Sequence, residues 1–318
     1  MRRFGENKTY ITRDESSDEL IALTQASQVT QECENGAVGD NGMLGAGCVD
    51  PTDFHRSALL IGLKEEQTTG YNPIKLGVIA STDTHVSNPG NVKESDWAGS
   101  VVGEGTPVER LQKGILTSGI DGNPGGLAGI WAEQNTRDSI FNALLRKEVF
   151  GTSGPRIRPR FFAGWNINEN LCNVNEMISD AYASGVPMGS DLMPSRSKSF
   201  PKFLMHAAKD PEGLNIESIQ LVKGWIDEEG NMNTKVIPVL SEIGGAESLC
   251  KVYTDTEFEN SLPSYYYMRV VEPKSPRWHT YDCERLSEDD RPDVCTNETY
   301  PSFIREMAWT SPIWYRPE

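Results

Sequence analysis

The stretch LGVIASTDTHVSNPGN, residues Leu76 to Asn91, sets the first expectation about the fold. Its continuous apolar run predicts a strand from Leu76 to Ser81 that is buried on both faces, as in a parallel sheet or an α/β barrel. Asp83 and His85 follow where this strand runs out, and in α/β barrels the loops after the strands carry the chemistry. The stretch therefore predicts a strand of a parallel sheet or an α/β barrel, with a polar pair at its C-terminal end.

The pair Asp83 and His85 has two interpretations. Residues two apart in an extended backbone point to the same side, so this carboxylate and this imidazole can converge on one divalent ion. An oxygen ligand and a nitrogen ligand together suit Zn, Mn or Fe. A capped turn with a hydrogen-bonded histidine explains the same spacing without a metal, and the spacing alone favours this simpler interpretation.

The segments on either side predict further α/β structure. Residues 50–70 have apolar residues at helical spacing, with Asp50 or Thr52 as the cap and Gly70 as the end of the helix. Thr136 is the cap of a second helix, which stands between two apolar runs. These three segments have the order strand, helix, strand, which is the βαβ signature; they are residues 126–133, 137–148 and 149–154.

The second half of the chain has a different pattern. From Arg156 onward, alternating apolar and polar residues are separated by Pro, Gly and Asp turns, which predicts antiparallel strands in a small sandwich. The predicted fold class is therefore α/β plus β, with α/β units over residues 1–155 and a β-rich, sandwich-like domain packed on them over residues 156–318. The alternating segments are residues 156–165, 202–210, 217–227, 233–241 and 264–272.

The composition limits the classes of partner. The chain has 318 residues, of which 37% are hydrophobic and 24% charged, as expected for a folded protein large enough for two domains. A formal net charge of -16 repels phosphate backbones and anionic lipids, which argues against nucleic acid and membranes as partners. No run approaches the roughly 18 apolar residues of a membrane span. We expect a soluble protein, periplasmic or secreted if a signal segment precedes this chain, and the oligomeric state stays open.

The six cysteines contain no C-x-x-C pair, so neither a zinc knuckle nor a thioredoxin-type motif is indicated. Cys33 with Cys48, and Cys283 with Cys295, flank loops rich in Gly, Pro or Asp that a disulfide would restrain in an oxidising compartment. For an exported protein this predicts a bond between Cys283 and Cys295, and free buried thiols are the alternative.

Several long motifs, taken in order, resemble one protein family, the domain-of-unknown-function family 3604. That family is similar to the PHP (polymerase and histidinol phosphatase) group of metal-dependent phosphoesterases. The resemblance covers almost the whole chain and rests on the motifs IKLGVIASTDTH, NPGNVKESDWAG, NPGGLAGIWAEQNTRDSIFNALLRKEVFGTSGPRIRPRFFAGW, GVPMGSDL, AAKDPEGLNIESIQLVKGW and REMAWTSPIWYRP.

The resemblance implies a distorted PHP-like barrel that holds two or three divalent metal ions, with Asp83 and His85 as ligands from the D-x-H motif. The PHP pattern also has an early H-x-H pair, and this sequence contains no H-x-H. We therefore expect residues 1–155 to correspond to the C-terminal part of the barrel. Metal affinity should be weak, because two ligands are fewer than the three or more usual for a catalytic ion.

The remaining candidate residues would hold a substrate or move a proton. Thr152, Ser153 and Arg156 surround a Gly-Pro turn, where hydroxyls, backbone N–H groups and a guanidinium can hold a phosphate or carboxylate; Asn91 is a further candidate. A purely structural turn explains this motif equally well. Glu133 ends an apolar run and is the candidate for proton transfer, although an acid just before a helix N-terminus is the alternative.

Two hypotheses about function follow. In the first, the protein is a metal-dependent hydrolase of phosphoesterase type, in which a metal-activated water attacks a phosphoester of a small anionic molecule. In the second, it is a non-catalytic protein or fragment that has lost the metal cluster, and its β-rich half binds a glycan or a protein partner.

Overall fold

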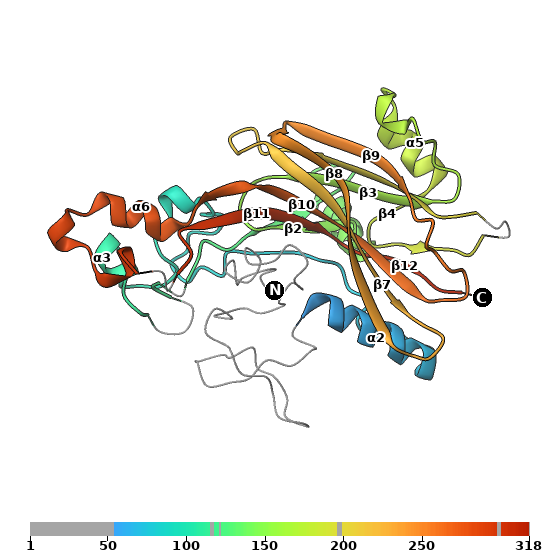
Figure 1. Cartoon of the computed structure of the whole chain (residues 1–318), viewed down its shortest axis with the longest axis horizontal. Coiled ribbons are helices and arrows are strands. Elements are labelled where there is room, and N and C mark those ends of the chain that lie inside the picture. The colour runs from blue at the N-terminus through green and yellow to red at the C-terminus, as the bar shows by residue number, and fades with distance from the viewer. Residues whose placement is uncertain (1–53, 115–117, 121, 196–198, 298–299, 318) are drawn as a thin grey trace.

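Two packed β-sheets with helices on their outer faces form the centre of the molecule (Figure 1). The structure is a computed structural model, and it describes residues 54–114, 118–120, 122–195, 199–297 and 300–317. None of the helices in these ranges is long and apolar enough to cross a membrane.

The larger sheet is built around β10, Ser264–Pro276. One edge of β10 pairs with β7, and the other edge pairs with β11 and then β12, all antiparallel. Beyond them, β8 pairs with β7, β2 with β11, β1 with β2, and β5 with β12. The other strands of this sheet are β1 (Leu127–Ile130), β2 (Val149–Thr152), β5 (Asp191–Leu192), β7 (Ile216–Ile226), β8 (Met232–Ala246), β11 (Phe303–Thr310) and β12 (Ile313–Tyr315).

The smaller sheet has four antiparallel strands in the order β4-β3-β6-β9. The main core lies between the two sheets, where Phe203 of β6 packs against Phe161 of β3 on one side and against Tyr266 of β10 on the other. All three aromatic side chains are fully buried. The strands are β3 (Arg158–Gly164), β4 (Val186–Pro187), β6 (Lys202–Ala208) and β9 (Ser248–Thr254).

Helices cover the outer face of each sheet (Figure 1). Helix α2, His55–Thr69, packs Leu59 and Leu63 onto the larger sheet, and it ends at Gly70, whose φ of 76° places it in the left-handed region that glycine adopts without strain. Helix α5, Met177–Ser184, and the short η4, Leu171–Asn173, cover the smaller sheet. Helix α4, Arg137–Leu145, connects β1 to β2, and Thr136 caps its first turn.

A third unit stands at the α6 end of the sandwich, on the left of Figure 1. Its small core contains Trp97, Leu111, Ile120 and Trp278, and the two tryptophan rings lie 4.5 Å apart. Its elements are η3 (Glu94–Asp96), α3 (Pro107–Arg110), α6 (Trp278–Arg285), η5 (Glu288–Asp290) and η6 (Asp293–Cys295).

The structure confirms the antiparallel β-rich second half and corrects the first. No strand forms from Leu76 to Ser81: the segment is extended and partly buried, but it makes isolated hydrogen bonds, from Val78 N–H to Ser311 Oγ and from Gly126 N–H to Ser81 O. It packs on the outer face of the sheet instead of pairing at an edge.

The strand, helix, strand order of β1, α4 and β2 is present, but the two strands are antiparallel neighbours and not a parallel βαβ unit. The described residues form no closed barrel. Strands β1 and β2 lie in the same sheet as β10 and β11, so one sheet joins the residue ranges 1–155 and 156–318. The predicted caps of α2, Asp50 and Thr52, lie outside the described residues.

The described part of the chain contains two disulfides. The predicted Cys283–Cys295 bond is present and ties α6 to η6. A second bond, Cys172–Cys250, was not predicted; it joins η4 to β9 across 78 residues of sequence. The other predicted pair, Cys33 and Cys48, lies outside the described residues.

We expect the Cys172–Cys250 bond to contribute most of the disulfide stabilisation. In the chain-entropy account a longer closed loop restricts the unfolded chain more, so replacing both cysteines with alanine should lower the free energy of unfolding by roughly 2–4 kcal/mol. Denaturant titrations under non-reducing conditions measure this loss, with Cys283→Ala/Cys295→Ala, which opens a shorter loop, as the comparison. An equal or larger loss in the comparison variant would contradict the expectation.

Candidate functional site

A β-bulge in the larger sheet places two glutamates beside each other. The register between β10 and β11 shifts between Val271 and Lys274, so that two residues of β10, Glu272 and Pro273, lie opposite one residue of β11, Glu306. Bulges of this kind change the direction of a side chain or end the pairing, and they are common next to functional sites.

Both glutamates extend the inner face of the sheet beyond the apolar core. Val270 and Ala308 pair with each other and belong to the core between the sheets. Glu272 and Glu306 lie two residues further along the same strands, with only 1% and 5% of their surfaces exposed. Two buried acids at the end of a core lower the stability of the fold unless a partner compensates them. They therefore indicate a candidate functional site.

A cavity of about 530 Å³ lies at the two glutamates. Its lining also comes from four other parts of the chain: the segment 90–96, Gly154 and Arg156 after β2, Asp210 and Gly213 between β6 and β7, and Tyr281 of α6. A Cβ atom on either glycine would come within 3.0 Å of its neighbours, so the backbone approaches closely on both sides. We call this space the acidic cavity.

Two of the three buried carboxylates in the acidic cavity are held by hydrogen bonds. The Ser153 hydroxyl donates to the Glu306 carboxylate. The Asp210 carboxylate accepts the backbone N–H groups of Arg156, at 2.7 Å, and Glu212, at 3.0 Å. Both groups are therefore fixed in orientation by neighbours that are themselves part of the cavity or directly behind it.

Glu272 is different, because its Oε1 atom is buried without a hydrogen-bond partner among the described residues. Burial, together with the negative charges of Glu306 and Asp210, raises the pKa of this carboxyl to about 8, and Lys209 opposes the shift. The carboxyl therefore holds its proton at neutral pH, and the residue lines the acidic cavity. A buried polar atom in this state is a candidate contact for a ligand.

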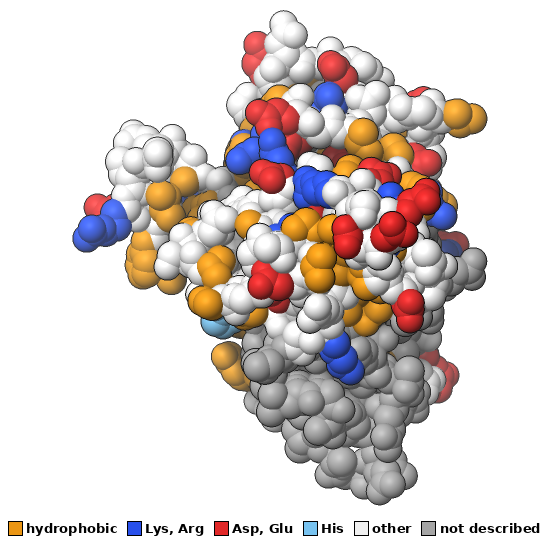
Figure 2. Space-filling view, turned by 90° about the vertical axis from the view of Figure 1, so that its left-hand side faces the viewer, with side chains coloured by type: hydrophobic (Ala, Val, Ile, Leu, Met, Phe, Trp, Pro, Cys, Tyr) orange, Lys and Arg blue, Asp and Glu red, His pale blue; other side chains and the backbone are white. Residues whose placement is uncertain are grey.

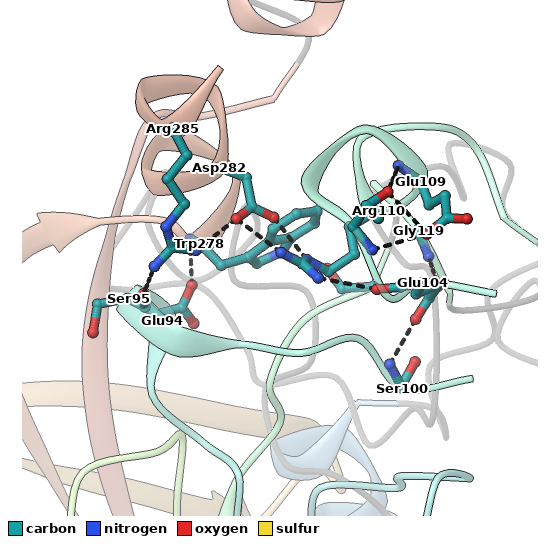
Figure 3. A network of polar contacts seen from close by, with 12 residues as sticks. Glu94, Ser95, Ser100, Glu104, Glu109, Arg110, Gly119, Trp278, Asp282 and Arg285 are labelled. Atoms are coloured by element: carbon teal, nitrogen blue, oxygen red, sulfur yellow. Dashed lines mark hydrogen bonds and ion pairs between the residues drawn. The ribbon is translucent and has the colours of Figure 1, made fainter. Parts of the chain in front are cut away.

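One wall of the acidic cavity is fixed by a network of charged groups (Figure 3). Glu94, on this wall, accepts the backbone N–H of Trp278 at 2.6 Å. Behind it, Asp282 of α6 accepts two hydrogen bonds from Arg110, at 2.7 and 3.1 Å, and one from Arg285 at 2.7 Å. Arg110 and Asp282 are both buried, so this bidentate pair ties α3 to α6 where neither charge has access to water.

The structure brings two of the sequence-predicted site residues to the acidic cavity. Asn91 and Arg156 both line it, and the Arg156 side chain is exposed at its edge. Ser153 lies behind it and contacts it through Glu306. Thr152 is buried in β2, where its hydroxyl accepts the Gly154 N–H at 3.3 Å, which is a structural role.

The other predicted residues lie elsewhere. Glu133 is exposed at a different cavity, next to Trp131. Asp83 is half-buried with a φ of 51°, and His85 is exposed, with its backbone N–H bonded to Ser100 O at 2.7 Å. Neither lines the acidic cavity. Within the described residues no group of three or more His, Cys, Asp or Glu side chains is arranged to hold a metal ion.

Sequence reasoning missed Glu272, Glu306 and Asp210. The sequence does contain a sign of Glu272 and Glu306, because each acid interrupts a largely apolar segment, YYYMRVVEP and REMAWT respectively. An acid at a core position is an exception that calls for an explanation. The register shift that places the two acids together is a tertiary feature and has no sequence signature here.

A comparison with models of protein families assigns the chain to a family. Residues 41–241 and 238–317 match the model of a family described as a protein of unknown function (DUF3604). The chain belongs to this family. No curated protein and no solved structure matches this DUF3604 member.

Charges are mixed on the surface near the acidic cavity. Figure 2 looks at the end of the molecule that carries α6 and α3, and there acidic and basic side chains lie interspersed among hydrophobic ones. At the cavity edge Lys93 and Glu212 form an exposed salt bridge of 2.9 Å. Exposed pairs of this kind stabilise a protein little, so this contact can open at small cost.

We expect Asp282→Asn to destabilise the cavity wall. The change leaves the Arg110 guanidinium buried without a counter-charge, which typically costs about 3–5 kcal/mol when one partner of a buried pair is removed. Thermal and denaturant unfolding measure the loss, and Asp289→Asn, an exposed acid in η5, is the control. A loss no larger than that of the control would show that the pair does not hold the wall.

The raised pKa of Glu272 predicts a pH-dependent stability. Between the ordinary glutamate value near 4.5 and about 8, the folded protein keeps a proton that the unfolded chain has released, so the free energy of unfolding falls as the pH rises through this window. Glu272→Gln cannot lose a proton. It should match the wild type near pH 5 and exceed it near pH 8 by on the order of a few kcal/mol.

Urea titrations from pH 5 to 8 in the presence of a chelator test this expectation. Glu288→Gln, an exposed acid in η5, should keep the wild-type dependence on pH. If Glu272→Gln and the wild type had parallel profiles, the carboxyl would be ionised in the folded protein.

Proposed function

We propose that this protein is a metal-dependent hydrolase of phosphoesterase type and that the acidic cavity is its substrate site. One observation carries the proposal: Glu272, which has a buried carboxyl oxygen without a hydrogen-bond partner among the described residues, and Glu306 line a cavity whose edge carries Arg156 and Asn91. Oxygen donors at the base and anion-binding groups at the edge are what a phosphoester and a cation need together.

The charge of the acidic cavity supports a cation. The carboxylates of Glu306 and Asp210 would repel an anionic substrate, and a divalent ion offsets this repulsion. Two carboxylates together with substrate oxygens are a common way to hold Mg²⁺ or Mn²⁺, which does not require three preformed protein ligands. Among the ions expected from the sequence, oxygen donors favour Mn over Zn and Fe. When bound, such an ion polarises the phosphoryl oxygens and lowers the pKa of a bound water.

The protein groups have separate roles in this proposal. The Arg156 guanidinium and the Asn91 amide hold the substrate anion at the cavity edge. The Ser153 hydroxyl keeps the Glu306 carboxylate in one orientation, since it donates to that group from directly behind the cavity. Glu306 would hold the ion through its carboxylate oxygens, and Glu272 would join it once the cation displaces the proton of that carboxyl. Asp83 and His85 remain proposed ligands of the PHP type, at a position separate from the acidic cavity.

The experiment measures hydrolysis of p-nitrophenyl phosphate and bis(p-nitrophenyl) phosphate by the full chain, after chelation and then with added Mn²⁺. We expect Mn²⁺ to restore turnover, and Glu306→Gln to lower kcat by about 100-fold or more, in the range known for removal of one group that acts on the reacting atoms. Arg156→Gln should raise KM more than it lowers kcat, because it holds the ground-state anion.

Glu288→Gln is the control for the loss of one negative charge and should keep full activity. Asp83→Ala and His85→Ala separate the two metal positions: a loss of metal content in these variants with an intact acidic cavity supports the PHP-type site. Equal turnover in the wild type and in Glu306→Gln would refute the acidic cavity as the site. The absence of any metal-stimulated turnover, with bound glycan detected instead, would favour the non-catalytic alternative.

A further inference from the structure

A second cavity, of about 640 Å³, contains two arginines and is separate from the acidic cavity. It lies where β1, β3 and α5 meet the residues just before β2. Trp131 is its main aromatic residue, and its polar lining comes from Glu133, Arg146, Glu148, Arg160, Tyr182 and Ser190. We call it the arginine cavity.

A buried acid holds the two arginines together. Glu148 is only 3% exposed; its carboxylate accepts a hydrogen bond from the Tyr182 hydroxyl and another from Arg146 Nη2 at 3.3 Å, and it forms a salt bridge of 3.9 Å with Arg160 Nη1. Two positive charges therefore share one buried negative charge. The centre of the site has a net charge of +1 within a protein whose net charge is -16.

The two guanidinium groups have many unused donors. Each guanidinium has five N–H donors. Within the described residues Arg146 makes one side-chain hydrogen bond, of 3.3 Å, and Arg160 makes one, of 3.4 Å to Tyr182. Both distances are beyond the usual range for an N–H···O bond. Burial lowers the pKa of Arg160, as expected for a partly buried cation that its neighbours compensate incompletely.

The position of Arg160 is fixed before any ligand binds. Its guanidinium carbon lies 3.3 Å from the centre of the Trp131 ring, in a cation–π stack. The Trp131 ring is itself held, because its N–H donates to Pro159 O at 2.9 Å. A planar guanidinium held in this way presents its donors without a large loss of conformational entropy, which favours a planar, bidentate acceptor.

We propose that the arginine cavity binds an oxyanion, the carboxylate or phosphate group of a small molecule, between Arg146 and Arg160. The exposed carboxylate of Glu133 lies at the same cavity and repels an anion. It therefore limits affinity and disfavours a doubly charged group. This assignment does not depend on the function proposed for the acidic cavity, since the two cavities share no lining residue.

Isothermal titration calorimetry of the full chain tests the inference with D-glucuronate, its neutral analogue glucose, and inorganic phosphate. We expect at least one of the two anions to bind and glucose not to bind. Arg160→Gln and Arg146→Gln should each weaken the binding tenfold or more, and Glu133→Gln should tighten it several-fold. Because Arg146 is about half exposed, its variant should fold even if Arg160→Gln does not.

Arg158→Gln is the matched control: it removes one arginine from β3, two residues before Arg160, at a position that does not line the cavity. It should leave the affinity unchanged. Stronger binding of glucuronate identifies a carboxylate ligand, and stronger binding of phosphate identifies a phosphate ligand. Binding of neither anion, binding that persists in both arginine variants, or equal binding of glucose would overturn the inference.

Discussion

The pairing of β10 with neighbours on both edges is the constraint on which the rest of the structure depends. Residues 264–272 of β10 are all buried, so their backbone N–H and C=O groups need partners within the sheet, and β7, β11 and β12 supply them. Alternate side chains then serve two cores: Tyr266 faces the smaller sheet, while Tyr265 and Tyr267 face α2. The bulge at Glu272 ends this regular pattern, and the acidic cavity begins where the apolar core stops.

The acidic cavity comes at a cost to stability. An apolar pair at the positions of Glu272 and Glu306 would extend the core without desolvating two carboxyls. Hydrogen bonds offset only part of this desolvation cost. Ser153 donates to Glu306, whereas Glu272 stays protonated and one of its oxygens has no partner among the described residues. Incomplete compensation is typical of a site that is completed by a ligand, and less typical of a site built only for stability. This reasoning connects the geometry of the bulge to the proposed function.

The sequence predicted local structure well and long-range pairing poorly. The alternation of apolar and polar residues predicted the antiparallel strands after Arg156, and the cap and the helical spacing predicted α4. These signals depend only on residues close together in the chain. An apolar run cannot reveal which strand it will pair with or in which direction. Two predictions were wrong for this reason. The segment Leu76–Ser81 packs on a face of the sheet without pairing in it, and β1 and β2 are antiparallel instead of parallel. The sequence analysis identified Asn91 and Arg156 as site residues. It did not identify the pair of Glu272 and Glu306, because their proximity depends on the register between β10 and β11.

The two cavities lie at opposite ends of one short strand. Glu148 precedes β2 and belongs to the arginine cavity, while Ser153 follows β2 and orients Glu306 in the acidic cavity. Five residue steps of extended chain separate the two positions, about 17 Å at the usual rise of a strand. Strand β2 is buried throughout and paired on both edges. It therefore holds the two cavities apart as a rigid spacer, which keeps the proposed cation site and the proposed oxyanion site separate.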